Sequence, residues 1–358
     1  RVIDVWPNNP MGHGAENMKY RFQWNFPIFF SPHNPNKLYT TSNHFHVTTN
    51  EGQSWNVISP DLTRNESEKL GPSGGPITKD NTSVEYYGTI FAACESPYEK
   101  DLLWAASDDG LINVSKDGGD NWENVTPSNA PDHIMWNSVE PDPFIKGGLY
   151  VAGTLYKTGD FKPYLYKTKD YGKTWIKITN GIPNNFFTRV LRADPKRQGL
   201  LYSGTESGMF ISFDDGSSWN SFQLNLPLVP ITDLALKDDN LIASTQGRSI
   251  WIIDDLGPIH QINKEIENSN FHIFSPIDSY RMGSRGWGGE SASAGKNHHN
   301  GVEVFFNINK NIINDSSNIS LEFLDKNKKL IKKYSNNDKK NPLKMDGEKN
   351  SFVWNMRY

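Results

Sequence analysis

Short apolar runs of strand length, separated by polar turns, recur along most of the chain. In the first part of the chain they come in pairs joined by a short polar link. The pairs are residues 38–42 with 45–48, 103–107 with 111–115, 149–154 with 164–168, and 200–205 with 209–212. A further apolar run precedes each pair and ends at a proline, namely Pro32, Pro97, Pro143 and Pro195. Runs of this length bounded by turn residues predict β-strands.

Each pair of strands ends in the same turn sequence, Ser/Thr-x-Asp/Asn-x-Gly-x-x-Trp. The four copies end at Trp55, Trp122, Trp175 and Trp219. The Asp or Asn can bond the backbone of its own turn, and the Gly adopts a positive φ without a Cβ clash. We therefore expect a positive φ at all four Gly residues, and four Trp rings that are largely buried between neighbouring sheets.

The strand that follows each Trp brings every unit to four strands, the content of one β-propeller blade. Four blades are predicted at residues 20–64, 84–129, 132–182 and 184–228, and a fifth unit at residues 230–262 keeps the strands but lacks the turn sequence. The predicted fold class is all-β, with blades of four antiparallel strands over residues 1–263. A linker and loop follow at residues 264–300, where residues 283–300 are rich in Gly, Ser and His.

Residues 301–358 have a different pattern, in which residues 302–308, 319–324 and 330–334 alternate apolar and polar side chains. Such alternation predicts strands with one buried face, here part of an immunoglobulin- or fibronectin-like β-sandwich. We expect the propeller and the sandwich both to belong to a larger protein.

Composition excludes several classes of function. The chain has 358 residues and a net charge of −4, so it lacks the basic field that holds nucleic acid. No apolar run is long enough to span a membrane. Cys94 is the only cysteine, so no intrachain disulfide can form. We expect no cofactor and no metal, because His44 and His46 share a strand face without a third ligand.

The four turns resemble the Asp boxes of the bacterial neuraminidase repeat superfamily, which includes sialidases, two-propeller xyloglucanases, photosystem assembly factors and sortilin-type receptors. Residues 21–25, 59–64, 246–251 and 350–358 are similar to a subgroup of large secreted bacterial proteins labelled glycosyl hydrolase or sortilin N-terminal domain. The resemblance implies a secreted, periplasmic or outer cell-surface location. The expected partners are a glycan, an extended peptide or protein, and other chains of a surface assembly. Asp boxes specify a fold and not an activity.

Candidate ligand residues follow from the geometry of a propeller, in which the loops entering the innermost strands meet the middle loops at one face of the channel. The residues at these positions are Gln23, Trp24, Asn25, His44, Glu85, Tyr86, Tyr87, His133, Trp136, Asn137, Arg189, Glu206 and Arg248. Aromatic rings beside amides and charges suit a sugar or an extended peptide. The alternative for Trp24, Tyr86 and Trp136 is packing between blades.

Two enzyme classes share this fold. Sialidase chemistry is disfavoured, because Glu85 and Tyr86 are adjacent in a strand and point apart. A glycosidase resembling the xyloglucanases needs two carboxylates across a cleft. Asp233, at the start of an inner strand, is the candidate for one of them, although a hydrogen-bonded strand-end Asp is the favoured interpretation. The predicted function is therefore a non-catalytic binding module, with a glycoside hydrolase as the alternative and an assembly factor as a third possibility.

Overall fold

The computed structural model describes residues 3–8, 11–75, 77–79, 81, 85–280, 299–312, 317–340, 342–345, 347 and 349–357. It contains two compact units, Arg1–Leu236 with Ile242–Trp251, and Lys237–Leu241 with Ile252–Tyr358. Strands dominate both units. In the described part of the chain no helix is long and apolar enough to cross a membrane.

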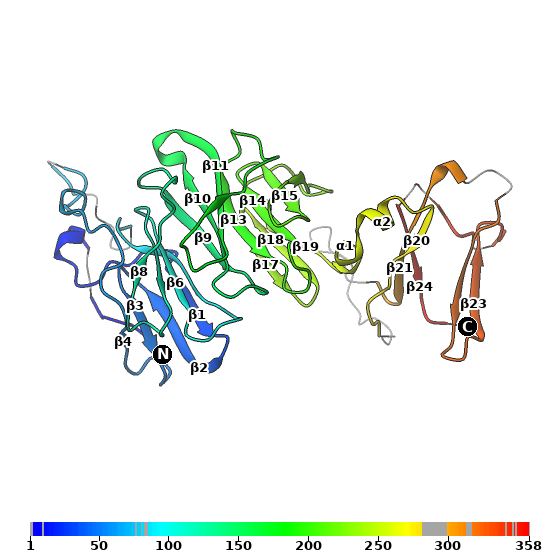
Figure 1. Ribbon diagram of the computed structural model, residues 1–358, viewed down its shortest axis with the longest axis horizontal. Coiled ribbons are helices and arrows are strands. Elements are labelled where there is room, and N and C mark those ends of the chain that lie inside the picture. Colours follow the sequence, from blue (N-terminus) through cyan, green and yellow to red (C-terminus); the bar gives the residue numbers. More distant parts are fainter. Residues whose placement is uncertain are drawn as a thin grey trace. The chain divides into compact units, whose positions relative to one another are not determined.

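The first unit is built from antiparallel four-stranded sheets, in each of which the strand order follows the chain (Figure 1). The first two sheets are β1 (Ile28–Ser31), β2 (Asn34–Thr41), β3 (Phe45–Thr48) and β4 (Asn56–Val57), then β5 (Ile90–Glu95), β6 (Leu103–Ser107), β7 (Ile112–Ser115) and β8 (Glu123–Asn124). The next two are β9 (Met135–Pro141), β10 (Leu149–Leu155), β11 (Asp160–Thr168) and β12 (Ile176–Lys177), then β13 (Thr188–Ala193), β14 (Leu201–Thr205), β15 (Gly208–Ser212) and β16 (Asn220–Ser221). These four sheets are the predicted blades.

The fifth predicted unit differs from the expectation. Its sheet consists of β17 (Ile231–Lys237), β18 (Asn240–Thr245) and β19 (Ile250–Ile253). In the described residues it therefore has three strands, and the fourth strand of the other sheets has no counterpart. This unit lacks the Ser/Thr-x-Asp/Asn-x-Gly-x-x-Trp turn, which in the other sheets leads directly into the fourth strand.

Successive sheets of the first unit pack face to face, and this packing makes the core. Contacts join β2 with β5, β5 with β9, and β9 with β13. Between the first two sheets, for example, Tyr39 and Phe45 pack in one cluster with Leu103 and Ala105. Sequential four-stranded sheets stacked in this way are propeller blades, so the predicted all-β fold class is confirmed.

The four Ser/Thr-x-Asp/Asn-x-Gly-x-x-Trp turns have the hydrogen bonds that their sequence predicts. In the second sheet the Ser115 hydroxyl donates to Asp117 (2.8 Å), Gly119 N donates to the Ser115 oxygen (2.8 Å), and Asn121 N donates to Asp117 (2.9 Å). The four Gly residues all have a positive φ, at +73°, +108°, +80° and +79° in chain order. This part of the prediction is confirmed.

The expected burial of the four Trp rings holds fully only for Trp219, which is 3% exposed. Trp55, Trp122 and Trp175 are half-buried. All four rings precede an outermost strand of two residues, so the length of that strand does not explain the difference in burial.

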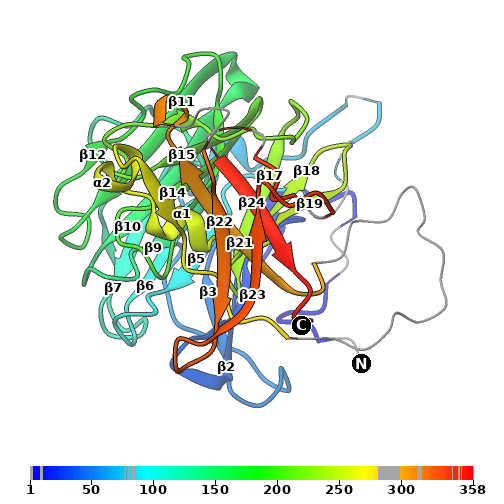
Figure 2. The same ribbon diagram turned by 90° about the vertical axis from the view of Figure 1, so that its right-hand side faces the viewer.

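The second unit contains α1 (Gly257–Gln261), α2 (Lys264–Glu267) and two small sheets. One sheet is β20 (Phe271–Ile273), β21 (Val302–Ile308) and β24 (Lys349–Trp354), and the other is β22 (Ser320–Leu324) and β23 (Leu330–Ser335) (Figure 2). Val304, Phe306, Leu321 and Leu343 share one core, so the two sheets pack together. The predicted strands are present, whereas the loop predicted at residues 283–300 lies largely outside the described residues.

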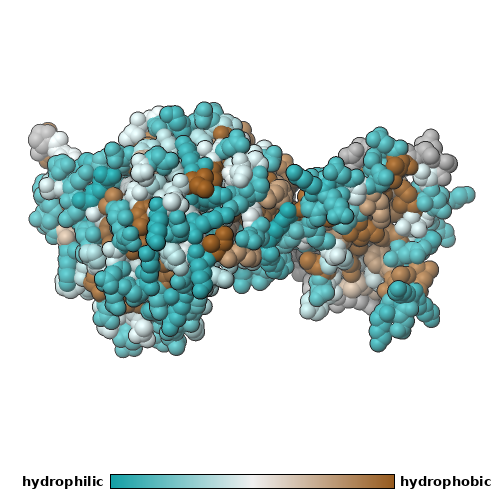
Figure 3. Space-filling model, in the orientation of Figure 1, coloured by the Kyte–Doolittle hydropathy of each residue, from teal (hydrophilic) through white to brown (hydrophobic). Residues whose placement is uncertain are grey.

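Short 3-10 helices complete the structure: η1 (Ala15–Asn17), η2 (Ser67–Lys69), η3 (Tyr156–Thr158) and η4 (Lys310–Ile312). Of these, η3 lies in the loop between β10 and β11. The surface of the first unit seen in Figure 3 is mostly hydrophilic, with scattered hydrophobic side chains.

Candidate functional site

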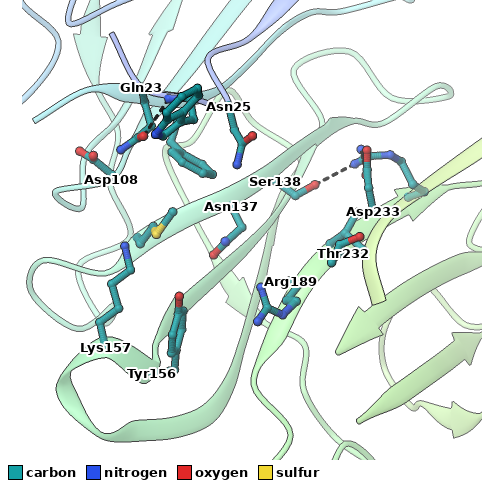
Figure 4. Close-up of a pocket in the computed structure, with 15 residues that line it drawn as sticks. Gln23, Asn25, Asp108, Asn137, Ser138, Tyr156, Lys157, Arg189, Thr232 and Asp233 are labelled. Atoms are coloured by element: carbon teal, nitrogen blue, oxygen red, sulfur yellow. Dashed lines mark hydrogen bonds and ion pairs between the residues drawn. The ribbon is translucent and has the colours of Figure 1, made fainter. Parts of the chain in front are cut away.

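A pocket of about 630 Å³ lies in the first unit against the innermost strands β5, β9, β13 and β17. Its lining residues are Gln23, Trp24, Asn25, Phe91, Asp108, Met135, Asn137, Ser138, Tyr156, Lys157, Arg189, Val190, Arg192, Thr232 and Asp233. In Figure 4, Gln23 and Asp108 lie on one side of the pocket, and Thr232 and Asp233 on the opposite side. Innermost strands are the channel side of a propeller, as expected for the ligand face.

Bulges in three successive inner strands direct side chains into this pocket. The pairing register skips one residue in each strand: Phe91 in β5, Asn137 in β9 and Arg189 in β13. All three skipped residues line the pocket. A β-bulge leaves one residue out of the ladder and re-aims its side chain, and bulges are common beside functional sites. The repeated bulge therefore gives three blades an equivalent pocket residue.

Trp24 supplies an open aromatic surface at the pocket. Its side chain is 65% exposed, and its indole Nε1 donates a hydrogen bond to Glu85 Oε1 (3.2 Å). Gln23, which bridges to Glu85 through the backbone, accepts a hydrogen bond from Trp24 N at 2.8 Å. Glu85 thus holds the ring in position without lining the pocket itself.

Asn137 lines the pocket, and its side chain carries a buried acceptor. Its Oδ1 atom is inaccessible to solvent and has no hydrogen-bond partner among the described residues. A buried polar atom without a partner costs about 1–3 kcal/mol, so native structures rarely contain one without a reason. A ligand that donates a hydrogen bond would satisfy Asn137 Oδ1 once a rotation of this side chain brings the atom into the pocket.

Both arginines of the pocket are neutralised by neighbouring carboxylates. Arg189 pairs with Glu206 at 2.6 Å and lies over the rings of Phe187 and Tyr156. Arg192 pairs with Asp233 at 2.7 Å and donates to Ser138 at 2.8 Å. Lys157 is exposed and has no ion-pair partner in the described part of the chain. The pocket therefore carries little net charge.

Two further carboxyl groups lie at the pocket or next to it, and burial raises the pKa of each. Burial raises the pKa of Asp108 to about 7, although hydrogen bonds from Gly88 N, Thr89 N and the Thr89 hydroxyl favour its charged form. Burial likewise raises the pKa of Glu140 to about 7, opposed by the nearby Arg192 guanidinium. Glu140 does not line the pocket.

The structure brings together part of the predicted site. Gln23, Trp24, Asn25, Asn137, Arg189 and Asp233 line the pocket, and Glu85 and Glu206 hold two of them. Trp136 does not reach it, because the ring is fully buried between the second and third sheets. Tyr86 also belongs to a core, packed with Ala15 and Leu70. Trp136 and Tyr86 were therefore wrongly assigned to the binding face, because both side chains are buried in core clusters.

Four other predicted residues lie away from the pocket lining. The Tyr87 hydroxyl bonds His133 at 3.3 Å, and burial together with Asp109 and Asp108 raises the pKa of Tyr87 to about 12. His44 bonds the Ser59 carbonyl at 3.1 Å, and Arg248 is exposed and bonds the Gly247 carbonyl. None of the four belongs to the pocket lining. Among the described residues, no group of three His, Cys, Asp or Glu side chains could hold a metal ion.

Sequence reasoning missed several lining residues, chiefly Tyr156, Lys157, Ser138 and Arg192. The long link between the strands at residues 149–154 and 164–168 was a usable signal for Tyr156 and Lys157, since it marks an inserted loop. Ser138 and Arg192 lie further along the inner strands, and no pattern in the sequence separates them from ordinary strand residues.

No protein-family model matches the chain, and no curated protein matches it either. Solved structures similar in fold include the GH74 xyloglucanase from Xanthomonas campestris, at 15% identity and a TM-score of 0.48 over 63% of this chain and 36% of that chain. A GH74 enzyme from Niastella koreensis is 16% identical, with a TM-score of 0.47 over 64% of this chain and 36% of that one. YCF48 bound to D1 peptide is 19% identical, with a TM-score of 0.36 over 46% and 51% of the two chains.

The chain spans about a third of the length of the two GH74 structures. At these identities and TM-scores the likeness carries no argument about activity, ligand or partners. The fold and the pocket together define a β-propeller module with a weakly charged pocket at its inner strands.

Proposed function

We propose that this module binds a neutral glycan in the pocket at the inner strands and that it does not catalyse a reaction by itself. The observation that carries the proposal is the pairing of an exposed indole, Trp24, with a buried acceptor, Asn137 Oδ1, in one pocket. Sugar rings stack on indoles, and sugar hydroxyls donate hydrogen bonds to carboxamide oxygens.

The remaining lining supports the same ligand class. Gln23, Asn25 and Thr232 add amides and a hydroxyl that can each donate and accept hydrogen bonds. The pairing of Arg189 with Glu206 and of Arg192 with Asp233 leaves little charge to attract a phosphate or a carboxylate. An extended peptide would use some of the same groups, and binding measurements with both kinds of ligand distinguish a peptide from a glycan.

Replacing Trp24 by Ala should weaken glycan binding. Loss of one stacked ring costs on the order of 1 kcal/mol beyond the area lost, or about five-fold in affinity. Titration calorimetry against a panel of neutral oligosaccharides measures this change. Tyr98→Ala is the matched control, because Tyr98 is 50% exposed and lies outside the pocket lining. Equal affinities of wild type and Trp24→Ala, or binding of extended peptides alone, would refute the glycan proposal.

A glycoside hydrolase is the second candidate, favoured by one observation. Asp108 and Asp233 line opposite sides of the same pocket, and the pKa of Asp108 is raised to about 7 while Asp233 is ion-paired with Arg192. Glycoside hydrolysis requires two carboxyl groups that flank the scissile bond. The three hydrogen bonds that Asp108 accepts fix it as part of a turn, which favours binding over catalysis.

Hydrolysis assays on the full-length protein separate the two candidates. If the protein is a hydrolase, it should release sugar from a polysaccharide, and Asp233→Asn should abolish turnover with little effect on glycan affinity. If it is a binding module, neither the full-length protein nor its Asp233→Asn variant should release sugar from a panel of β-glucans and xyloglucan. Location outside the cytoplasm, and binding of other chains in a surface assembly, rest on the sequence resemblance and stay predictions.

A further inference from the structure

The seam between neighbouring blades repeats one hydrogen bond three times. The indole Nε1 of Trp122 donates to the Ile58 carbonyl (2.8 Å), that of Trp175 to the Val125 carbonyl (2.7 Å), and that of Trp219 to the Ile178 carbonyl (2.7 Å). Each acceptor directly follows the outermost strand of the preceding sheet, β4, β8 or β12. The Asp-box Trp therefore links each blade to the blade before it.

The Asp-box Gly packs at the same place. Gly119 lies against Ile58, Gly172 against Val125 and Gly216 against Ile178, each so closely that an added Cβ would meet the neighbour within 3 Å. One apolar residue after the outermost strand thus supplies both a carbonyl for the Trp and a side chain for the Gly of the next blade.

The first blade has half of this arrangement. Gly52 packs against the side chain of Ile3, as its counterparts pack against Ile58, Val125 and Ile178. The Trp55 Nε1 atom is buried, but it has no hydrogen-bond partner among the described residues. Ile3 therefore occupies the position that the residue after the outermost strand of the preceding blade has at the later seams. The hydrogen bond from Trp55 Nε1 to the carbonyl of that residue is the part of the arrangement that is missing.

The face of the first sheet that points away from the second sheet is apolar and partly uncovered. Ile28 is 62% exposed, whereas its counterparts by strand register in the third and fourth sheets, Val139 and Leu191, are 8% and 0% exposed. Leu38 is half-buried, whereas its counterparts Leu103, Leu149 and Leu201 are fully buried. A cavity of about 360 Å³ lined by Ile3, Trp6, Leu38 and Trp55, among others, lies on this face.

We propose that this face is the docking surface of a further blade, formed by residues that precede Arg1 in the full-length protein, with Ile3 directly after its outermost strand. The occupant is a segment of the same chain. Ile3 is covalently continuous with the first blade, and it already lies at the position that the preceding blade fills at each later seam. A second copy would have to displace Ile3. The missing acceptor for Trp55 is then the Ile3 carbonyl, once a preceding strand holds that residue.

The test compares the full-length protein with the chain of residues 1–358. Ile28→Ser should lower the midpoint of thermal unfolding in the full-length protein by about as much as the matched substitution Val139→Ser. In the 1–358 chain Ile28→Ser should have little effect, because Ile28 is already exposed there, whereas Val139→Ser should lower the midpoint in both proteins. Hydrogen exchange of wild-type residues 26–42 and 48–56 provides a second readout that needs no variant, and it should be slower in the full-length protein.

Two results would overturn the proposal. The first is an Ile28→Ser variant as harmless in the full-length protein as in the 1–358 chain, with unchanged hydrogen exchange. The second is protection of this face that disappears on dilution, together with a dimer mass by light scattering, which would assign the face to a second copy.

Discussion

Replacing Trp136 by Ala should destabilise the protein by about 3–5 kcal/mol, the usual cost of truncating a buried Trp. The side chain is 0% exposed and packs in one cluster with Trp104, Ile134 and Val151. Its ring meets that of Tyr166 edge to face at a centroid distance of 5.9 Å. The cavity left by the indole would lie between two blades, where strands on both sides resist collapse. Urea denaturation gives the change in the free energy of unfolding.

Trp24→Ala is the matched control for this prediction. Because Trp24 is 65% exposed, its removal should change the unfolding free energy little while weakening glycan binding. Trp24 lines the pocket at the inner strands and is expected to bind the ligand, whereas Trp136 lies in the core and holds two blades together. A Trp136→Ala variant that is as stable as wild type would contradict the assignment of this ring to the seam between blades.

Replacing Arg21 by Ala should destabilise the protein by about 3–5 kcal/mol, because it breaks a mostly buried ion pair and leaves one partner without compensation. Arg21 is 4% exposed and donates to Asp61 Oδ2, the Thr63 hydroxyl and the Gly88 carbonyl, each at 2.9 Å. One guanidinium thus links three segments around the first and second blades. Chemical denaturation of the variant measures the loss.

The exposed pair between Lys116 and Glu123, at 3.4 Å, is the control for Arg21. Lys116→Ala should change stability by only about 0–1 kcal/mol, since surface ion pairs contribute little. Equal effects of Arg21→Ala and Lys116→Ala would contradict the structural role of Arg21.

The Arg21 variant should also change the pH dependence of stability. Burial acts to raise the pKa of Asp61, but hydrogen bonds from Thr63, the charge of Arg21 and a hydrogen bond from Asn43 outweigh it, so the pKa is lowered. A carboxyl group with a lowered pKa stabilises the fold above its unfolded pKa, and that contribution is lost as the pH falls through the folded pKa. Without Arg21 the folded pKa of Asp61 rises, so the smaller contribution that remains is lost at higher pH.

The fold was predictable because its information is local and repeated. The spacing of Asp117, Gly119 and Trp122 has a mechanical reason within one turn, and four copies fix the number of four-stranded sheets. The prediction was wrong in two respects: the fifth sheet has three described strands, and three of the four turn tryptophans are half-buried.

The site was predictable only in part, because alternation along a strand does not show where the ladder skips a residue. Asn137 and Trp136 are neighbours, and both were assigned to the binding face. The bulge at Asn137 directs that residue to the pocket and leaves Trp136 in the core. The positions of Arg192 and Ser138 depend on contacts across blades, such as the bond between these two side chains, which a single sequence does not display.

The most direct test of the binding proposal is the crystal structure of the protein with its best-binding neutral oligosaccharide. The account predicts a sugar ring stacked on Trp24, with a hydroxyl group within hydrogen-bond distance of Asn137 Oδ1, in the pocket bordered by Arg189 and Asp233. A sugar bound on another face of the molecule, with this pocket filled only by water, would contradict it.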